Sequence, residues 1–166
     1  MSRIYWDTML FIYWLEENPQ FGKRVDAIWS RMQERNDQLI TGALAFGEVL
    51  AGAYKRGANQ ERRQEVKAAL ECSVSAVIPF TAKTAHVYGR IKGSLKIPSA
   101  DAIHLACAAT AGTDFFLTND NNLVGKVVPG IQFIARTGFK YPLKRPSPRA
   151  SPRASPSPPA TPNPEC

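Results

Sequence analysis

The chain has 166 residues, enough for one domain with a substantial apolar core, and a formal net charge of +7. Residues 136–166 hold six basic side chains and one acidic one, a net of +5, while the other 135 residues hold 15 basic and 13 acidic side chains, a net of +2. The high isoelectric point is therefore a property of the C-terminal segment. It does not indicate a basic nucleic-acid-binding core.

The cysteines and histidines indicate neither a disulfide framework nor a zinc site. Cys72, Cys107 and Cys166 are an odd number without short spacing, and the two histidines are scattered. The apolar run at residues 8–15 is too short to span a bilayer, and the charged residues around it do not fit a signal peptide. We therefore expect a reduced, soluble, cytoplasmic protein with no membrane association.

Hydrophobic periodicity and turn residues predict alternating strands and helices. Strands are predicted at residues 4–6, 38–41, 74–78, 115–117 and 131–134. Helices are predicted at residues 9–15, 21–36, 42–54, 59–70, 84–95 and 100–111, with a short helical piece at 123–127. This order predicts an α/β domain over residues 1–135 with three layers (α/β/α). Helices are expected on both faces of a mainly parallel sheet, and the first strand is expected in the centre of that sheet.

The first candidate site residue is Asp7, which follows the first predicted strand. It could instead be only the N-cap of the next helix. That helix is apolar on nearly every side, and its Phe11, Tyr13 and Trp14 are more aromatic area than one face of a small sheet needs. We therefore expect an oligomer contact there and a homodimer.

The second candidate is Glu48, a single carboxylate inside an apolar helical run. A carboxylate among apolar neighbours is costly unless it faces solvent, a partner or a metal. The simpler alternative is that Glu48 lies on the solvated face of its helix. Gly47 beside it, at a position where glycine is unfavourable in a helix, suggests a close approach by another part of the chain.

Asp101 and Asp120 are brought together by the predicted topology. Asp101 lies in the first turn of the helix that Ser99 is expected to cap, and Gly112 is expected to end that helix. Asp120 follows the next strand. A helix antiparallel to its strand begins at the edge of the sheet where the strand ends, so both acids are expected at one edge. Alone, Asp101 could merely complement the helix dipole, and Asp120 could merely form a turn.

Polar residues near these acids are assigned to other roles. Asp114 precedes the strand that ends before the last acid, so it is expected at the opposite edge of the sheet. His104 is expected to be a packing residue with hydrogen bonds at the helix–sheet boundary. Arg90, Lys92 and Lys96 lie on the approach to the acidic edge and are the basic residues best placed for phosphate contact.

The segment 136–166 has a different composition from the rest of the chain. It holds nine of the thirteen prolines and repeats a Ser-Pro-Arg-Ala unit at residues 147–154. It has almost no apolar residues to bury, so we expect a disordered basic tail.

Four stretches together resemble the PIN-domain ribonucleases, especially the VapC-type toxins of bacterial toxin–antitoxin pairs. They are residues 4–8 (Ile-Tyr-Trp-Asp-Thr), 46–52 (Phe-Gly-Glu-Val-Leu-Ala-Gly), 97–106 (Ile-Pro-Ser-Ala-Asp-Ala-Ile-His-Leu-Ala) and 116–120 (Phe-Leu-Thr-Asn-Asp). Each stretch alone is weakly specific, whereas all four in family order are strongly so. The resemblance covers residues 1 to about 135, and nothing carries over to the tail.

The resemblance implies a PIN-like fold and a metal-dependent endoribonuclease that is the toxin of a type II pair, with RNA as substrate and a cognate antitoxin as partner. The implied catalytic and metal-binding quartet is Asp7, Glu48, Asp101 and Asp120, and the implied small hydroxyl residue is Thr118. Clustered carboxylates raise one another's pKa unless a cation is present, and Mg²⁺, or Mn²⁺ in its place, suits oxygen ligands. We expect Asp7 and Asp101 to bind the metal directly, and Glu48 and Asp120 to act through water.

Other function classes fit less well. A phosphorelay receiver needs adjacent acids after its first strand and a lysine after its last, and a haloacid-dehalogenase-type phosphatase needs an acid where Met9 stands. Two alternatives stay open. One is a PIN nuclease of RNA processing rather than a toxin, and the other is a catalytically silent PIN module that binds RNA or protein.

Overall fold

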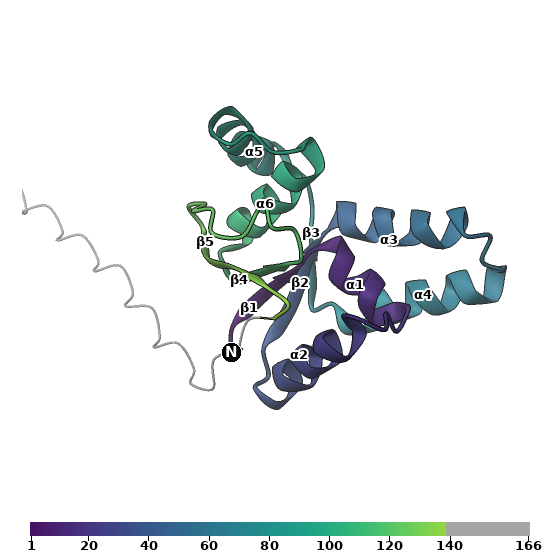
Figure 1. The fold of residues 1–166 in the computed structure, drawn as a ribbon. Helices are drawn as coiled ribbons and strands as arrows, with labels where there is room; N and C mark the ends of the chain where they lie inside the picture. Colours follow the sequence, from purple (N-terminus) through teal and green to yellow (C-terminus); the bar gives the residue numbers. More distant parts are fainter. Residues whose placement is uncertain (139–166) are drawn as a thin grey trace, which may run out of the picture.

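A five-stranded parallel sheet runs through the centre of the protein, with its strands in the order β3-β2-β1-β4-β5. The computed structural model describes residues 1–138, and Figure 1 shows their arrangement. The strands are β1 (Arg3–Trp6), β2 (Gln38–Gly42), β3 (Ala76–Ile78), β4 (Thr113–Thr118) and β5 (Ile131–Arg136). The helices of this part are α1 (Thr8–Leu15), α2 (Gly22–Glu34), α3 (Ala43–Lys55), α4 (Gln60–Ser73), α5 (Ala82–Ser94) and α6 (Ser99–Ala111). The prediction that the first strand is central is confirmed.

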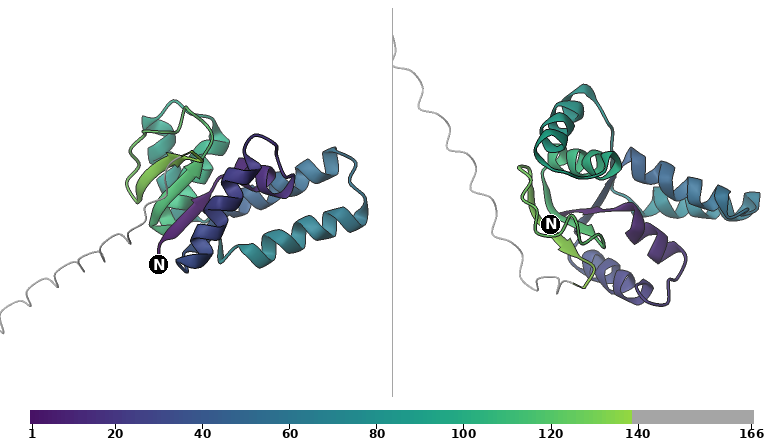
Figure 2. Two further views of the ribbon diagram at one scale, coloured as in Figure 1. Left: turned by 60° about the horizontal axis from the view of Figure 1, so that its bottom comes forward. Right: turned by 45° about the horizontal axis from the view of Figure 1, so that its top comes forward.

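Helices cover both faces of the sheet, which confirms the three layers (Figure 2). Side chains alternate along each strand, so Ile4 and Trp6 of β1 join one hydrophobic cluster and Tyr5 between them joins the other. The first cluster lies against α1 to α4, and the second lies against α5 and α6. The α3–α4 hairpin projects from this body (Figure 1).

The parallel register brings the carboxyl ends of β1 and β4 side by side. Trp6 pairs with Leu117, and the backbone N–H of Asp7 continues the pairing by donating to the Leu117 carbonyl at 3.0 Å. On the other side of β1, the Thr41 hydroxyl donates to the carbonyl of Trp6 at 2.9 Å. Residues that follow β1, β2 and β4 therefore meet at one edge of the sheet, where sites of open α/β sheets lie.

The helix α6 begins one residue earlier than predicted. Its N-cap is Pro98, which is extended, makes no side-chain capping hydrogen bond and accepts the N–H of Ala102 through its carbonyl at 3.1 Å. Ser99 is therefore the first helical residue, and the prediction that it caps the helix is wrong. Gly112 ends the helix in the left-handed conformation with φ 68°, as expected for a glycine in this position.

Two further local predictions are wrong. Residues 123–125 form turns and residues 126–127 are irregular, so the predicted helical piece is absent; Asp120 accepts the Asn122 N–H at 2.7 Å, and Gly125 has φ +82°. Gly47 has open space where a side chain would begin, so no other segment within residues 1–138 approaches it closely. The last strand, β5, runs on to Arg136, two residues beyond its predicted end.

The aromatic residues of α1 are used inside the described protein. Trp14 contacts Trp6 and Trp29 with ring centroids 6.0 Å and 5.4 Å away, and Tyr13 stacks on Phe21 at 4.7 Å. These aromatic side chains of α1 therefore pack against α2 and the sheet.

Within the described residues, no helix is long and apolar enough to cross a bilayer. Of the predicted disordered tail, residues 136–166, Arg136 belongs to β5, and the part from residue 139 onward lies outside the described residues.

Candidate functional site

The site is built where β1 and β4 end. Asp7 follows β1 and caps α1, its Oδ1 accepting the N–H of Thr8 at 2.7 Å. Its other oxygen, Oδ2, accepts the hydroxyl of Thr118 at 2.8 Å. Thr118 is fully buried at the end of β4, and its Oγ1 also accepts the N–H of Asp120 at 3.0 Å. One hydroxyl thus hydrogen bonds to the Asp7 carboxylate and to the backbone of Asp120, at the ends of two neighbouring strands. Asp7 caps α1 through one oxygen and takes part in the site through the other, so the two roles are compatible.

Glu48 reaches this edge from the middle of α3. Its Oε2 accepts a hydrogen bond from the Thr8 hydroxyl and lies 3.1 Å from Nε2 of His104. The side chain of Glu48 is 36% exposed, while that of His104 is only 3% exposed. Glu48 is therefore oriented by two buried side chains, and it does not lie on a plain solvated face.

Asp101 lies in the first turn of α6, one helical turn before His104. Burial, followed by the negative charges of Asp7 and Asp120, raises its pKa; Glu48 adds to this effect and His104 opposes it. Asp101 therefore lies within electrostatic reach of the other three acids. This confirms the prediction that at least one clustered carboxyl has a raised pKa.

The charge of the four acids is not neutralised by a basic side chain of the described residues. The ion pairs of this part of the chain place no lysine or arginine on Asp7, Glu48, Asp101 or Asp120, and the histidine beside Glu48 is the one potentially cationic partner. In the same residues, no three His, Cys, Asp or Glu side chains converge closely enough to hold a metal ion as they stand. The donor chemistry nevertheless fits Mg²⁺, since that ion takes one or two protein carboxylates and completes its shell with water and phosphate oxygens.

Asp114 lies at the opposite edge, as predicted. It is the second residue of β4, and its Oδ2 accepts the N–H of Arg3 at the start of β1 at 2.8 Å. Of the basic residues expected near the site, Arg90 and Lys96 are exposed, and Lys92 donates through Nζ to the Ile97 carbonyl just before α6.

Two residues of this hydrogen-bond network, Thr8 and Tyr5, were not predicted from the sequence. Thr8 hydrogen bonds to Glu48 and His104, and Tyr5 hydrogen bonds to His104, which is buried and hydrogen-bonded as expected. The available signal was the Asp-Thr pair directly after a strand. The contact of the Thr8 hydroxyl with Glu48, however, depends on how α1, α3 and α6 pack together, which the sequence does not show.

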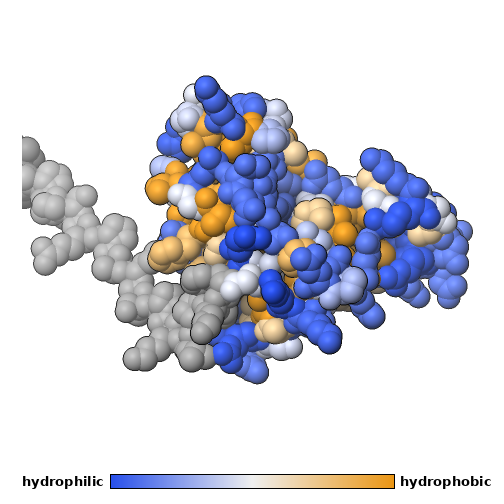
Figure 3. Space-filling view, in the orientation of Figure 1, coloured by the Kyte–Doolittle hydropathy of each residue, from blue (hydrophilic) through white to orange (hydrophobic). Residues whose placement is uncertain are grey.

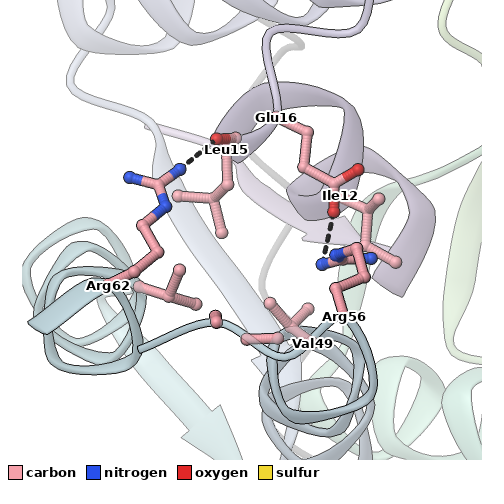
Figure 4. Close-up of a pocket in the computed structure, with 9 residues that line it drawn as sticks. Ile12, Leu15, Glu16, Val49, Arg56 and Arg62 are labelled. Carbon is pink, nitrogen blue, oxygen red and sulfur yellow. Dashed lines mark hydrogen bonds and ion pairs between the residues drawn. The ribbon is translucent and has the colours of Figure 1, made fainter. Parts of the chain in front are cut away.

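A second surface feature lies away from the acids, where α1 faces the α3–α4 hairpin. Apolar side chains show there in Figure 3, and Figure 4 shows the small hollow that they line, with a volume of about 80 Å³. Ile12 and Leu15 of α1 face Val49 of α3 across it. At its rim Arg56 pairs with Glu16 at 2.5 Å, and Arg62 donates to the Leu15 carbonyl at 3.0 Å.

Comparisons with known proteins agree with this architecture. The family model of the PIN domain matches residues 4–126, a span that contains all four acids and Thr118. No curated protein matches the chain.

Solved structures with the same fold include bacterial toxin–antitoxin complexes. The DNA-bound VapBC from Salmonella typhimurium is similar with a TM-score of 0.65 at 19% identity, over 82% of this chain and 99% of that one. VapBC2 from Rickettsia felis, bound to a DNA fragment from its promoter, has a TM-score of 0.64 at 16% identity, over 81% and 98%. VapBC-5 from Mycobacterium tuberculosis has a TM-score of 0.52 at 18% identity, over 82% and 99%. At such identities the likeness concerns the fold.

Proposed function

The chain belongs to the PIN-domain family, and on that premise we propose that it is a metal-dependent endoribonuclease. PIN domains are generally nucleases. The observation that carries the proposal is the placement of Asp7, Glu48, Asp101 and Asp120 at one edge of the sheet, where the ion pairs of the described residues supply no lysine or arginine. The raised pKa of Asp101, caused by burial and by the nearby Asp7 and Asp120, agrees with this placement. Such a site favours a divalent cation and, with it, a phosphodiester substrate.

We propose Asp7 and Asp101 as direct ligands of Mg²⁺ or Mn²⁺, with Glu48 and Asp120 acting through water. A bound divalent ion would orient water, lower its pKa and offset charge that develops on the phosphate. Among the described residues, the Asp101 carboxylate makes no hydrogen bond, which leaves its oxygens for a cation. Thr118 holds the Asp7 carboxylate in place through Oδ2.

The test is RNA cleavage by the purified chain, with the Asp101→Asn and Asp114→Asn variants compared in parallel. Both variants replace an aspartate by its amide, but Asp114 lies at the opposite edge of the sheet. We expect cleavage with Mg²⁺ or Mn²⁺, none with a chelator, none for Asp101→Asn and unchanged cleavage for Asp114→Asn. Equal loss in the two variants, or cleavage that survives Asp101→Asn, would contradict the proposed site.

We further propose that the nuclease is the toxin of a bacterial pair and binds an antitoxin polypeptide. The fold shared with VapBC complexes supports this role. Expression of the intact chain in a bacterium should arrest growth, Asp101→Asn should not, and the product of a small adjacent reading frame should restore growth. Cleavage in vitro without growth arrest would favour the alternative of a nuclease in RNA processing or decay.

The homodimer and the cytoplasmic location are also proposals. Light scattering of the purified chain tests the first, and cell fractionation tests the second. The cleavage assay also tests the alternative of a catalytically silent PIN module. Such a module would bind RNA or protein, and the intact chain would then not cleave RNA.

A further inference from the structure

A buried line of hydrogen bonds runs from the centre of the sheet to the acidic edge. We propose that Tyr5 and His104 are positioning residues: the Tyr5 hydroxyl fixes the imidazole of His104 with its hydrogen on Nε2, and this N–H holds the Glu48 carboxylate at the sheet edge. The consequence for RNA cleavage rests on the proposed function, whereas the hydrogen-bond arrangement does not.

The distances form a continuous path. The Tyr5 hydroxyl lies 3.0 Å from Nδ1 of His104, and Nε2 of His104 lies 3.1 Å from Oε2 of Glu48. Thr8 joins the far end, because its Oγ1 lies 3.3 Å from the same Nε2 and donates to the same Oε2. Tyr5 is fully buried and His104 nearly so, which excludes bulk water as a competing partner along most of this path.

Glu48 sets the direction of the hydrogen bonds to His104. A tyrosine hydroxyl keeps its hydrogen at neutral pH, so the Tyr5 O–H is available as a donor. A carboxylate oxygen only accepts hydrogen bonds, so Nε2 of His104, which lies 3.1 Å from Oε2 of Glu48, carries a hydrogen. A neutral imidazole with its hydrogen on Nε2 accepts at Nδ1, so the Tyr5 O–H donates to Nδ1 at 3.0 Å.

This direction explains how Glu48 is held. Oε2 receives two hydrogen bonds, from the hydroxyl of Thr8 and the N–H of His104, while Oε1 receives none from the described residues. A glutamate has three rotatable side-chain bonds, so two fixed donors on one oxygen select a single orientation and leave the other oxygen for a metal-bound water or substrate. Positioning of this kind is worth about 10–100-fold in metal affinity or activity at comparable sites.

Gly42 provides the space that the Tyr5 hydroxyl occupies. A Cβ at this position would lie 2.6 Å from the Tyr5 oxygen and 3.3 Å from the Cys107 sulfur. The φ of Gly42 is −88°, which any residue adopts, so the lack of a side chain matters here and the backbone angle does not. A methyl group at residue 42 would therefore displace the hydroxyl without deleting it.

Nitrogen NMR of the full chain labelled with ¹⁵N-histidine reports the arrangement directly, at pH ~8, above the ordinary pKa of histidine. We expect His104 to carry its hydrogen on Nε2 in the intact chain and in the control Tyr88→Phe. We expect a mixture of tautomers in Tyr5→Phe and in Gly42→Ala. A hydrogen on Nδ1 in the intact chain, or an unchanged spectrum in Tyr5→Phe, would overturn the inference whether or not the protein cuts RNA.

Cleavage tests the consequence of the arrangement. Glutamine can place an amide N–H close to the position of Nε2, so His104→Gln should keep cleavage within about threefold, whereas His104→Leu and Tyr5→Phe should lose about 10-fold or more at unchanged RNA affinity. Thermal melts identify variants that fail to fold, and Tyr5→Phe, the mildest change, keeps the test decisive if His104→Leu is unfolded. Equal activity of all three variants would overturn the positioning role. Absence of cleavage by the intact chain would instead contradict the proposed function.

Discussion

Thr118 and Asp7 belong to neighbouring strand ends that are 111 residues apart in sequence, yet the Thr118 hydroxyl donates to Asp7 Oδ2 at 2.8 Å. The same Oγ1 accepts the N–H of Asp120 at 3.0 Å. One fully buried hydroxyl therefore acts as donor to one acid and acceptor for the backbone of another. A side chain of the same shape without the oxygen would leave two polar groups without their partner.

Thr118→Val should therefore weaken both folding and cleavage. Loss of a buried hydrogen-bond partner costs about 1–3 kcal/mol, which urea unfolding measures. Cleavage of RNA should fall by about 10–100-fold because Asp7 is no longer held. Thr118→Ser keeps the hydroxyl and is the matched control, with near-parental cleavage expected. A fully active Thr118→Val would show that Asp7 does not need this partner.

Metal and pH should act together on stability. In the folded protein the pKa of Asp101 is raised above the ordinary value of an aspartate, mainly by burial. Its contribution to stability is therefore fully present below that value and is lost as pH rises through the folded pKa. A cation favours the ionised carboxylates, and a ligand of the folded state alone adds about 2.7 kcal/mol at one hundred times its Kd. Mn²⁺ should thus raise the melting temperature more at pH ~8 than at pH ~5.5.

The Asp101→Asn variant is the complement of that experiment. It removes one of the mutually repelling charges, so without metal at pH ~8 it should melt higher than the parent while failing to cleave RNA. A metal-free variant that melts lower, or a parent indifferent to Mn²⁺ at both pH values, would mean that the four acids do not share a site.

Gly130 should be intolerant of substitution for reasons unrelated to the site. Its φ is +101°, and a Cβ there would lie 2.5 Å from the carbonyl oxygen of Ala109 in α6. Gly130→Ala therefore adds a backbone clash to the conformational penalty of about 1–2 kcal/mol. Gly125, with φ +82° and open space around it, is the matched control and should show the conformational penalty alone. Chemical denaturation measures the free energy of unfolding of Gly130→Ala and of Gly125→Ala. An equal decrease in the two variants would contradict a clash at residue 130.

Asp37 should matter for stability and not for cleavage. Its fully buried carboxylate receives the N–H of Ser2 at 2.6 Å and pairs with Nε of Arg35 at 2.9 Å, where β1 and β2 begin. Removing one partner of a buried ion pair typically costs about 3–5 kcal/mol. Asp37→Ala should lower the free energy of unfolding by about that amount and leave cleavage per folded molecule unchanged. Selective loss of cleavage at full stability would be inconsistent with this role.

Sequence reasoning succeeded where a residue marks the end of an element. Asp7 and Asp120 each follow a buried strand, and parallel pairing of β1 with β4 suffices to bring them to one edge. Asp114 was assigned to the opposite edge by the same logic. The edge at which each acid lies could be predicted because local apolar runs mark where the strands end. The handedness of the connections then determines that these strands run parallel.

Contacts that depend on tertiary structure could not be predicted. The sequence indicated Glu48 as a candidate, but its contact with Thr8 and His104 depends on how α1, α3 and α6 meet, which no local pattern encodes. The same limit explains Gly47, which suggested a close approach that the described residues do not make.

The central position of β1 has a consequence for the protein during its synthesis. β1 is made first, but one of its two neighbours in the sheet, β4, is made only after residue 112, and the last acid follows β4. A nascent chain short of residue 120 has neither a fully paired central strand nor a complete set of acids. Pairing between such distant segments comes late in folding. A ribosome that stalls or terminates early on this message would therefore release a chain without the complete set of acids, and the proposed site is first complete when nearly the whole domain has left the ribosome.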